Sequence, residues 1–102
     1  MTAREQLWYL INGVVDGSYE VKTFCDEFER IYNFETDKAE LTEQEKSEFE
    51  ELFRMVARFS EFEEDLKIPN MYFGKEEILA KVSVVQKLRF VLEAETFSFG
   101  KR

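Results

Sequence analysis

The chain has 102 residues, a formal net charge of −8 and a hydrophobic content of 44%. This length predicts a single domain over residues 1–102, with a modest core that needs no metal or disulfide. The negative charge argues against direct binding of nucleic acid or of an anionic membrane, because their phosphates would be repelled.

The single cysteine, Cys25, excludes an internal disulfide and suits a reducing compartment. The longest early uncharged run, residues 6–15, is too short to span a bilayer, and no signal peptide is evident. We therefore expect a cytoplasmic protein.

Histidine is absent, which removes the most common general base and the most common metal ligand. Cys25 has no histidine partner to activate it, and we expect it to be a small buried hydrophobe. The four glycines form no phosphate-binding loop. We expect no enzymatic activity, no metal, no cofactor and no small-molecule ligand.

Helical periodicity dominates the first half of the chain. Thr2 and Glu5 have the spacing of a capping box, which predicts a first helix over residues 3–16 that stops at Gly17. A second helix is expected from Ser18 to about Glu35, followed by a loop over residues 36–41. The predicted buried stripes contain Leu7, Leu10, Ile11, Val14, Val21, Phe24, Cys25, Phe28, Ile31 and Tyr32.

The capping-box spacing recurs at Thr42 and Glu45 and predicts a third helix that ends near Phe59 or Ser60. A fourth helix is expected over residues 75–94. Its stripe, with Val84 and Val91 as extra apolar positions, suggests burial on two sides. The predicted stripes contain Phe49, Leu52, Phe53, Val56, Ile78, Leu79, Val82, Val85, Leu88 and Leu92.

Two segments are less regular. Residues 61–74 hold the only proline, Pro69, and read as a long loop with fixed aromatic packing. Residues 96–102 are expected to fray, or to fold back through Phe97 and Phe99. Four amphipathic helices with short connections predict an all-α fold, an antiparallel four-helix bundle.

The charge is concentrated in the middle of the chain. Residues 26–65 carry fifteen acidic and five basic residues, a local net charge of −10. Such a surface suits a strongly basic protein, and the most common basic surfaces are those that bind nucleic acids. Charge runs are more often simply solvated, and that alternative stays open. Two acidic groups stand out: Glu61, Glu63, Glu64 and Asp65 in the long loop, and Glu35, Asp37, Glu40 and Glu43 between helices two and three.

The stretch LINGVVDGSYEVKTF (residues 10–24) resembles the start of the colicin D immunity family. The block ELFRMVARF (residues 51–59), with the acids after it, resembles that family's third helix and acidic loop. The pattern of residues 78–88 resembles its last helix. The resemblance covers roughly residues 6–92 and follows the order of the patterns.

This resemblance implies a small acidic helical protein that binds and neutralises the nuclease domain of a cognate toxin. The toxins of the family typically cut tRNA in the anticodon loop, and related immunity proteins accompany contact-dependent growth inhibition toxins. It implies a 1:1 heterodimer in which the acids after the third helix occupy the tRNA-binding cleft. At the end of that helix, where family members can carry an acid, this chain has Ala57 and Arg58. The candidate toxin contacts are Arg58, Glu61, Glu63, Glu64, Asp65, Tyr72 and Phe73, with Glu35, Asp37, Glu40 and Glu43 as a secondary acidic contact.

Other interpretations remain open. Met71, Tyr72 and Phe73 are either interface anchors or, as we favour, a core plug beneath the loop. Of Trp8 and Tyr9, one is expected to face outward or to pack on the last helix. As an alternative function, the chain could be an acidic adaptor or scaffold that self-associates through exposed Phe residues or binds another basic protein.

Overall fold

The computed structural model describes the backbone of residues 1–100 and the side chains of residues 1–89. The described chain is all-helical, as predicted, and its only β-type pairing is an isolated bridge between Phe59 and Phe73. Its elements in order are α1 (Ala3–Asp16), α2 (Val21–Arg30), a π-helix (Ile31–Glu35), a 3₁₀ turn (Lys38–Glu40), α3 (Glu43–Val56), α4 (Glu63–Leu66) and α5 (Lys75–Gly100).

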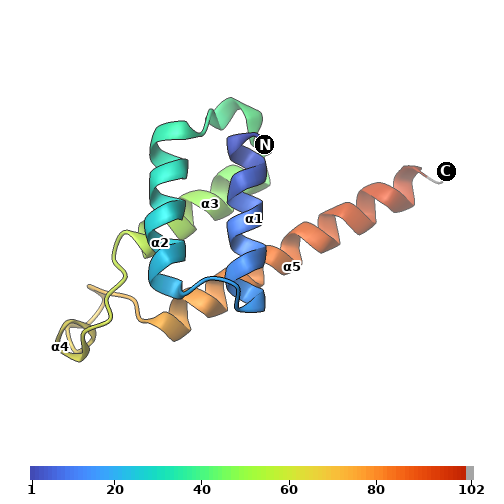
Figure 1. Cartoon of the computed structure of the whole chain (residues 1–102). Coiled ribbons are helices and arrows are strands. Elements are labelled where there is room, and N and C mark those ends of the chain that lie inside the picture. Colours follow the sequence, from blue (N-terminus) through green and yellow to red (C-terminus); the bar gives the residue numbers. More distant parts are fainter. Residues whose placement is uncertain (101–102) are drawn as a thin grey trace.

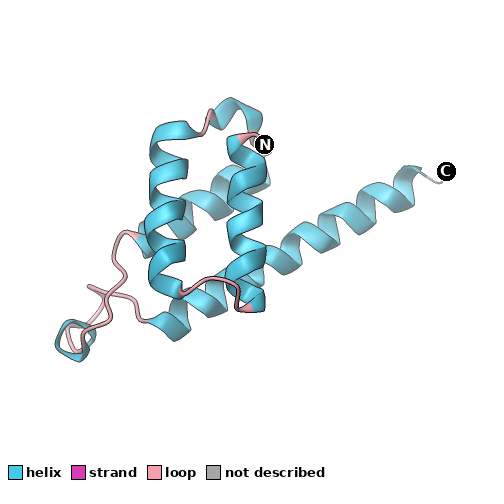
Figure 2. Ribbon diagram, viewed as in Figure 1, coloured by secondary structure: helices cyan, strands magenta, loops and turns pink. Residues whose placement is uncertain are grey.

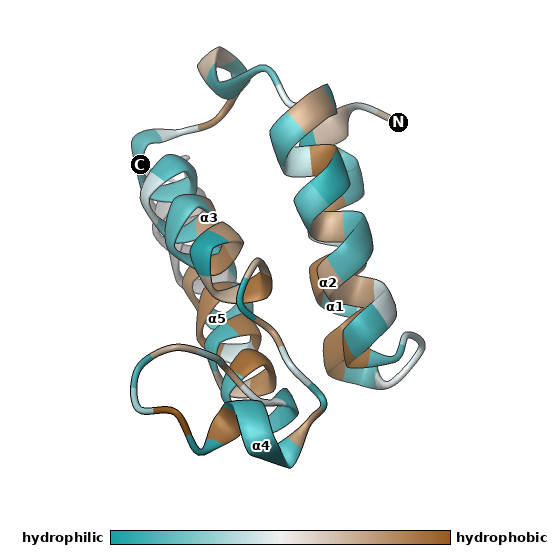
Figure 3. Ribbon diagram, turned by 90° about the vertical axis from the view of Figure 1, so that its left-hand side faces the viewer, coloured by the Kyte–Doolittle hydropathy of each residue, from teal (hydrophilic) through white to brown (hydrophobic). Residues whose placement is uncertain are grey.

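The helices form two layers. α1 and α2 lie side by side, and α3 and α5 lie behind them at an oblique angle (Figure 1, Figure 3). α1 packs on α2 and α5, while α3 packs on α2 and α5. The predicted antiparallel bundle is therefore not confirmed, because the two layers cross instead of running alongside each other.

One hydrophobic core fills the space between the layers. Three phenylalanine rings form its centre, with edge contacts from Phe49 to Trp8 and to Phe28 at centroid distances of 5.1 and 5.9 Å. The core consists of Leu7, Trp8, Leu10, Ile11, Val14, Val21, Phe24, Cys25, Phe28, Ile31, Tyr32, Leu41, Phe49, Leu52, Val56, Ile78, Val82 and Val85. The predicted stripes are largely confirmed, but Val84 is exposed, so burial of the last helix on two sides is wrong at this position.

A buried carboxylate joins the two layers. Glu45 is 5% exposed and accepts hydrogen bonds from Trp8 Nε1 (2.7 Å), Arg4 Nε (2.9 Å) and the Thr42 amide (2.9 Å). Burial alone would raise the pKa of Glu45, but the hydrogen bonds from Arg4, Thr42 and Trp8 outweigh it and lower the pKa. Both predicted capping boxes are formed, and the second one therefore also serves a tertiary contact.

A second polar contact joins α3 to α5. The Lys81 ammonium lies 2.8 Å from Glu48 and 3.1 Å from Glu51, and the side chains of Lys81 and Glu48 are mostly buried. Burial would lower the pKa of Lys81, but hydrogen bonds to the two carboxylates raise it. α3 thus makes one charged contact with α1, through Glu45, and another with α5, through Glu48 and Glu51.

The turn between α1 and α2 corrects the predicted start of the second helix. Gly17 ends α1 at φ 89°, and the Ser18 amide donates to Gly13 O at 2.8 Å and to the Asp16 carboxylate at 2.9 Å. Ser18 therefore completes the end of α1, and α2 begins only at Val21. The helical run does end at Glu35 as predicted, but its last five residues form a π-helix.

The other boundaries also differ from prediction. α3 ends at Val56, before the predicted Phe59 or Ser60, because Phe59 enters the bridge with Phe73. The long irregular connection follows, interrupted only by α4 (Figure 2). α5 continues to Gly100, past the predicted end at residue 94, and projects beyond the two layers (Figure 1). The side chains of Leu92, Val91, Phe97 and Phe99 lie outside the described residues.

Replacement of Gly17 tests the turn. Gly17→Ala should lower the free energy of unfolding by about 1 kcal/mol, because an alanine is strained at positive φ. An added Cβ would meet no atom within 4 Å beyond the neighbouring residues, so the loss comes from local backbone strain and not from a tertiary clash. Gly17→Asn is the matched control and should lose less, since Asn tolerates this conformation. Urea denaturation measures both, and equal stability of wild type and Gly17→Ala would contradict the assignment.

Removal of the Glu45 charge tests the contact between layers. Glu45→Gln should lower the free energy of unfolding by about 2 to 3 kcal/mol, because the amide places a donor among donors. Glu43→Gln, on the exposed start of the same helix, is the control and should change it by less than about 0.5 kcal/mol.

The same carboxylate predicts a pH dependence. Its folded pKa lies below the ordinary 4.5, so the unfolded chain binds the proton more readily. The stabilisation by Glu45 is fully present above the unfolded pKa of about 4.5 and is lost as the pH falls through the lower pKa of the folded state. Urea melts between pH 3 and pH 7 should show this acid loss in wild type, and a Glu45→Gln variant with the same acid slope would contradict it.

Candidate functional site

The predicted site residues fall on an arm, which we define as residues 61–73, between α3 and α5. The arm projects from one end of the molecule (Figure 1). Its two ends are joined by backbone hydrogen bonds: Phe73 N donates to Arg58 O at 2.9 Å, and Ser60 N donates to Phe73 O at 3.0 Å. The arm is therefore a closed excursion of the chain with a fixed base.

One of the predicted contact acids has a structural partner. Ser60 Oγ donates to Asp65 Oδ2 at 2.7 Å and accepts from Phe62 N at 3.1 Å. Ser60 is buried and Asp65 is half-buried, so this pair folds α4 back over the base of the arm. Asp65 is thereby less available to a partner than the sequence suggested.

The other three acids of the arm are exposed. In the described part of the chain, no hydrogen bond or ion pair engages the carboxylates of Glu61, Glu63 and Glu64. Most of the other acids in residues 26–65 are paired with a base. Of the fifteen acids in residues 26–65, eight are in ion pairs: Asp26, Glu27, Glu35, Glu43, Glu45, Glu48, Glu50 and Glu51. The arm therefore holds most of the carboxylates that this region leaves unpaired.

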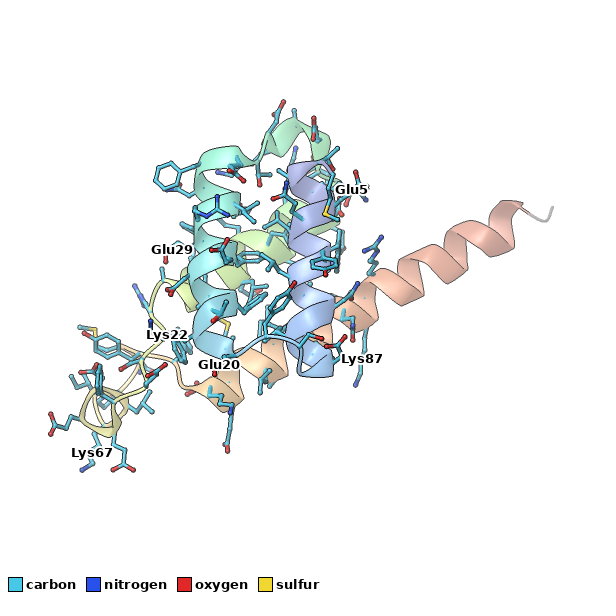
Figure 4. All side chains as sticks on the ribbon, in the orientation of Figure 1. Glu5, Glu20, Lys22, Glu29, Lys67 and Lys87 are labelled. Atoms are coloured by element: carbon cyan, nitrogen blue, oxygen red, sulfur yellow. The ribbon has the colours of Figure 1, made fainter. Side chains whose placement is uncertain are left out.

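Cations also lie on the arm and at its base. Lys67 is exposed among the side chains of the arm (Figure 4), and Arg58 and Lys75 are exposed where the arm leaves and rejoins the helices. The surface is therefore mixed and not purely acidic. Arg58, a candidate contact from the sequence, reaches the arm through its backbone carbonyl.

Exposed apolar side chains are interleaved with these charges. Phe62, at the start of α4, is 70% exposed, and brown segments flank the teal α4 in Figure 3. The predicted core plug is confirmed for Phe73, which is half-buried and packs with Phe59 against the core, but it is wrong for Met71 and Tyr72, which are exposed. The exposed large apolar side chains of the arm are Phe62, Leu66, Ile68, Met71 and Tyr72.

Phe62, Leu66 and Ile68 were not identified from the sequence. The sequence did carry a signal: these apolar residues stand singly among acids or just before Pro69, in a segment too short and too polar to form the buried stripe of a helix. Apolar residues in such a segment are candidates for exposure. Exposed apolar clusters of this kind typically mark an interaction surface.

A groove lies beside the arm, where the end of α1, the start of α2 and the start of α5 meet it. Its volume is about 760 Å³. Apolar side chains and a few charged ones line it, with Glu61 and Leu66 contributed by the arm. The apolar lining consists of Val14, Val15, Val21, Phe59, Leu66 and Leu79.

The second predicted acidic group lies at the opposite end of the molecule from the arm (Figure 1, Figure 3). Its members mostly serve local structure. Glu35 pairs with Arg30 at 3.0 Å, Glu43 pairs with Lys46 at 3.2 Å, and Asp37 accepts from the Ala39 amide at 3.0 Å; Glu40 is exposed. The two acidic groups therefore do not form one continuous surface.

Cys25 lies in the core, as expected. Burial, with the nearby carboxylates of Asp26 and Glu29, raises the pKa of its thiol to about 12. The thiol is therefore protonated at neutral pH and is a poor nucleophile.

Compared with known proteins, the chain matches no family model, no curated protein sequence and no solved structure. Among the described residues, no group of three or more His, Cys, Asp or Glu side chains is placed to hold a metal ion. None of the helices in the described part combines the length and the apolar character needed to cross a membrane.

The burial of Cys25 predicts its reactivity. In the native protein at pH 8, a thiol reagent such as 5,5′-dithiobis(2-nitrobenzoate) should label Cys25 only as fast as the protein opens. Labelling in 6 M guanidinium chloride should be complete within seconds and provides the control. Rapid labelling without denaturant would show that the thiol is accessible and would contradict its placement.

Proposed function

We propose that this chain is an immunity protein, an all-helical protein whose acidic arm binds and neutralises the nuclease domain of a cognate toxin. The observation that carries the proposal is the set of three exposed carboxylates, Glu61, Glu63 and Glu64, without partners in the described part of the chain. The protein performs no chemistry itself and acts as a cytoplasmic 1:1 inhibitor.

The physical basis is electrostatic. A tRNA-cleaving nuclease must hold phosphates with Lys and Arg side chains, and these remain available to any polyanion of similar spacing. Carboxylates on a projecting arm can enter such a cleft and accelerate the encounter through long-range attraction. The net charge of −8 supports this attraction.

The resemblance to the colicin D immunity family supports the same role, since the acids after its third helix correspond to this arm. The fixed base of the arm adds a structural argument. The hydrogen bonds between Phe73 and Arg58 and between Ser60 and Phe73 restrict the arm before binding, so less entropy is lost when it enters a cleft.

A second candidate function is an adaptor that self-associates through exposed phenylalanines. It is favoured by Phe34, which is 80% exposed at the end of the π-helix, far from the arm. Light scattering across a range of concentrations separates the two functions, because self-association without a toxin favours the adaptor.

Charge reversal tests the proposed role of the arm. The partner to use is the basic C-terminal domain of a secreted toxin encoded directly upstream of the gene. The double variant Glu63→Lys and Glu64→Lys should bind this domain at least about tenfold more weakly and lose protection of cells that express it. Association should also slow about tenfold between 50 and 300 mM salt.

The matched control is Asp26→Lys with Glu29→Lys, two exposed acids of α2 that lie outside the arm and outside both predicted acidic groups. It changes the net charge equally and should weaken binding less than threefold. Circular dichroism melts establish that all variants fold. Equal affinities for both double variants, with association insensitive to salt, would refute an arm that enters a basic cleft.

A further inference from the structure

We propose that the groove beside the arm is a docking site for an apolar side chain of the partner protein that is flanked by Lys or Arg. This inference rests on the proposed function and extends it, because it adds a second, apolar element to the interface. The groove is lined from four segments of the chain: the end of α1, the start of α2, the base of the arm and the start of α5.

The character of the groove favours a protein segment over a small molecule. Its volume of about 760 Å³ is within the range of about 300–1,000 Å³ of ligand sites. The apolar side chains of the lining come from four segments of the chain, and the charged side chains of Glu20, Lys22, Glu61 and Lys75 also line the groove. An apolar surface with charges beside it is the arrangement of a protein interface, in which a buried apolar anchor is surrounded by a polar rim.

One wall of the groove is held in place before binding. The Tyr19 ring lies directly against Gly13 of α1, so that any Cβ at Gly13 would clash with it. The Tyr19 and Tyr9 rings pack edge to face, with their centroids 6.2 Å apart. A preformed wall reduces the side-chain ordering that binding requires. This close packing explains why a glycine, which is normally unfavourable inside a helix, occupies position 13, within α1.

The charges around the groove indicate which partner fits. Glu20 and Glu61 line it, and Glu63 and Glu64 follow on the arm. Lys22 also lines the groove and lies near Glu20 at the start of α2 (Figure 4). Its ammonium is 3.7 Å from the Asp26 carboxylate, which offsets the positive charge. Lys75 is the other lysine among the lining residues. The two lysines balance Glu20 and Glu61 in number, but Asp26 beside Lys22 and the exposed carboxylates of Glu63 and Glu64 leave the wider surface net acidic, so a basic partner is complementary.

The exposed apolar side chains of the arm extend the same surface. Leu66 both lines the groove and belongs to the exposed set, so the groove continues into the arm without a polar break at this residue. Interfaces bind through buried apolar anchors surrounded by a polar rim, and this surface has both parts.

A defined peptide tests the groove without the toxin. The probe is a twelve-residue amphipathic helix of leucine, alanine and lysine, added to the ¹⁵N-labelled full chain and followed by NMR. Saturable shifts are expected at the amides of Val15, Tyr19, Glu61 and Leu79. Two control peptides, one with serine for leucine and one with glutamate for lysine, should each bind at least tenfold more weakly.

Substitutions localise the binding. Val15→Trp should fill the groove and weaken peptide binding at least fivefold. Val84→Trp is the matched control, because Val84 is also exposed on a helix but does not line the groove, and it should change binding less than twofold. Lys75→Glu should strengthen binding of the cationic peptide by at least twofold.

The outcomes separate this inference from the proposed function. No saturable shift at the groove, equal binding of the glutamate peptide, or equal loss in the Val15 and Val84 variants would overturn the docking site. A toxin domain that needs Glu63 and Glu64 but binds Val15→Trp as tightly as wild type would also overturn it and would leave the proposed function intact. A peptide that docks as expected, with no toxin bound, would uphold the groove and count against the proposed function.

Discussion

The Glu45 carboxylate is the contact on which the two-layer arrangement depends. It belongs to the capping box that begins α3, and it accepts hydrogen bonds from Trp8 and Arg4 of α1. The guanidinium of Arg89 lies over the Trp8 ring, with its central carbon 4.7 Å from the ring centroid. This cation–π contact connects α5 to the hydrogen-bonded group around Glu45. A buried charge is costly unless it is fully hydrogen-bonded, which makes this relative placement of α1 and α3 specific.

Ion pairing also distinguishes the helices from the arm, and we call α1, α2, α3 and α5 the body of the protein. Acids on α2 and α3 are largely matched with bases, as in the contact of Lys81 with Glu48 and Glu51. These pairs reduce the field of the densest acidic region. The carboxylates of Glu61, Glu63 and Glu64 stay solvated, and an unpaired charge on a projecting segment contributes most to attraction at a distance. The sequence count of charges overstates the field of the body relative to that of the arm.

Local signals in the sequence were sufficient for α1, whose cap, bounds and stop at Gly17 all follow from neighbouring residues. The end of α3 was not predictable in this way, because it depends on the pairing of Phe59 with Phe73, fourteen residues later. The roles of the acids were equally hidden. Asp65 and Glu64 are adjacent in the sequence, yet only Asp65 has Ser60 as a partner, and that difference arises from the fold of α4.

Charge and apolar surface on one arm act on different steps of binding. Long-range attraction raises the association rate and is screened by salt, whereas a side chain inserted into a groove mainly slows dissociation. A protein that bound its partner through carboxylates alone would associate fast and also dissociate fast. The position of Leu66, shared between the arm and the groove, places an apolar contact directly beside the charges. A complex built in this way could therefore persist at salt concentrations that weaken its formation.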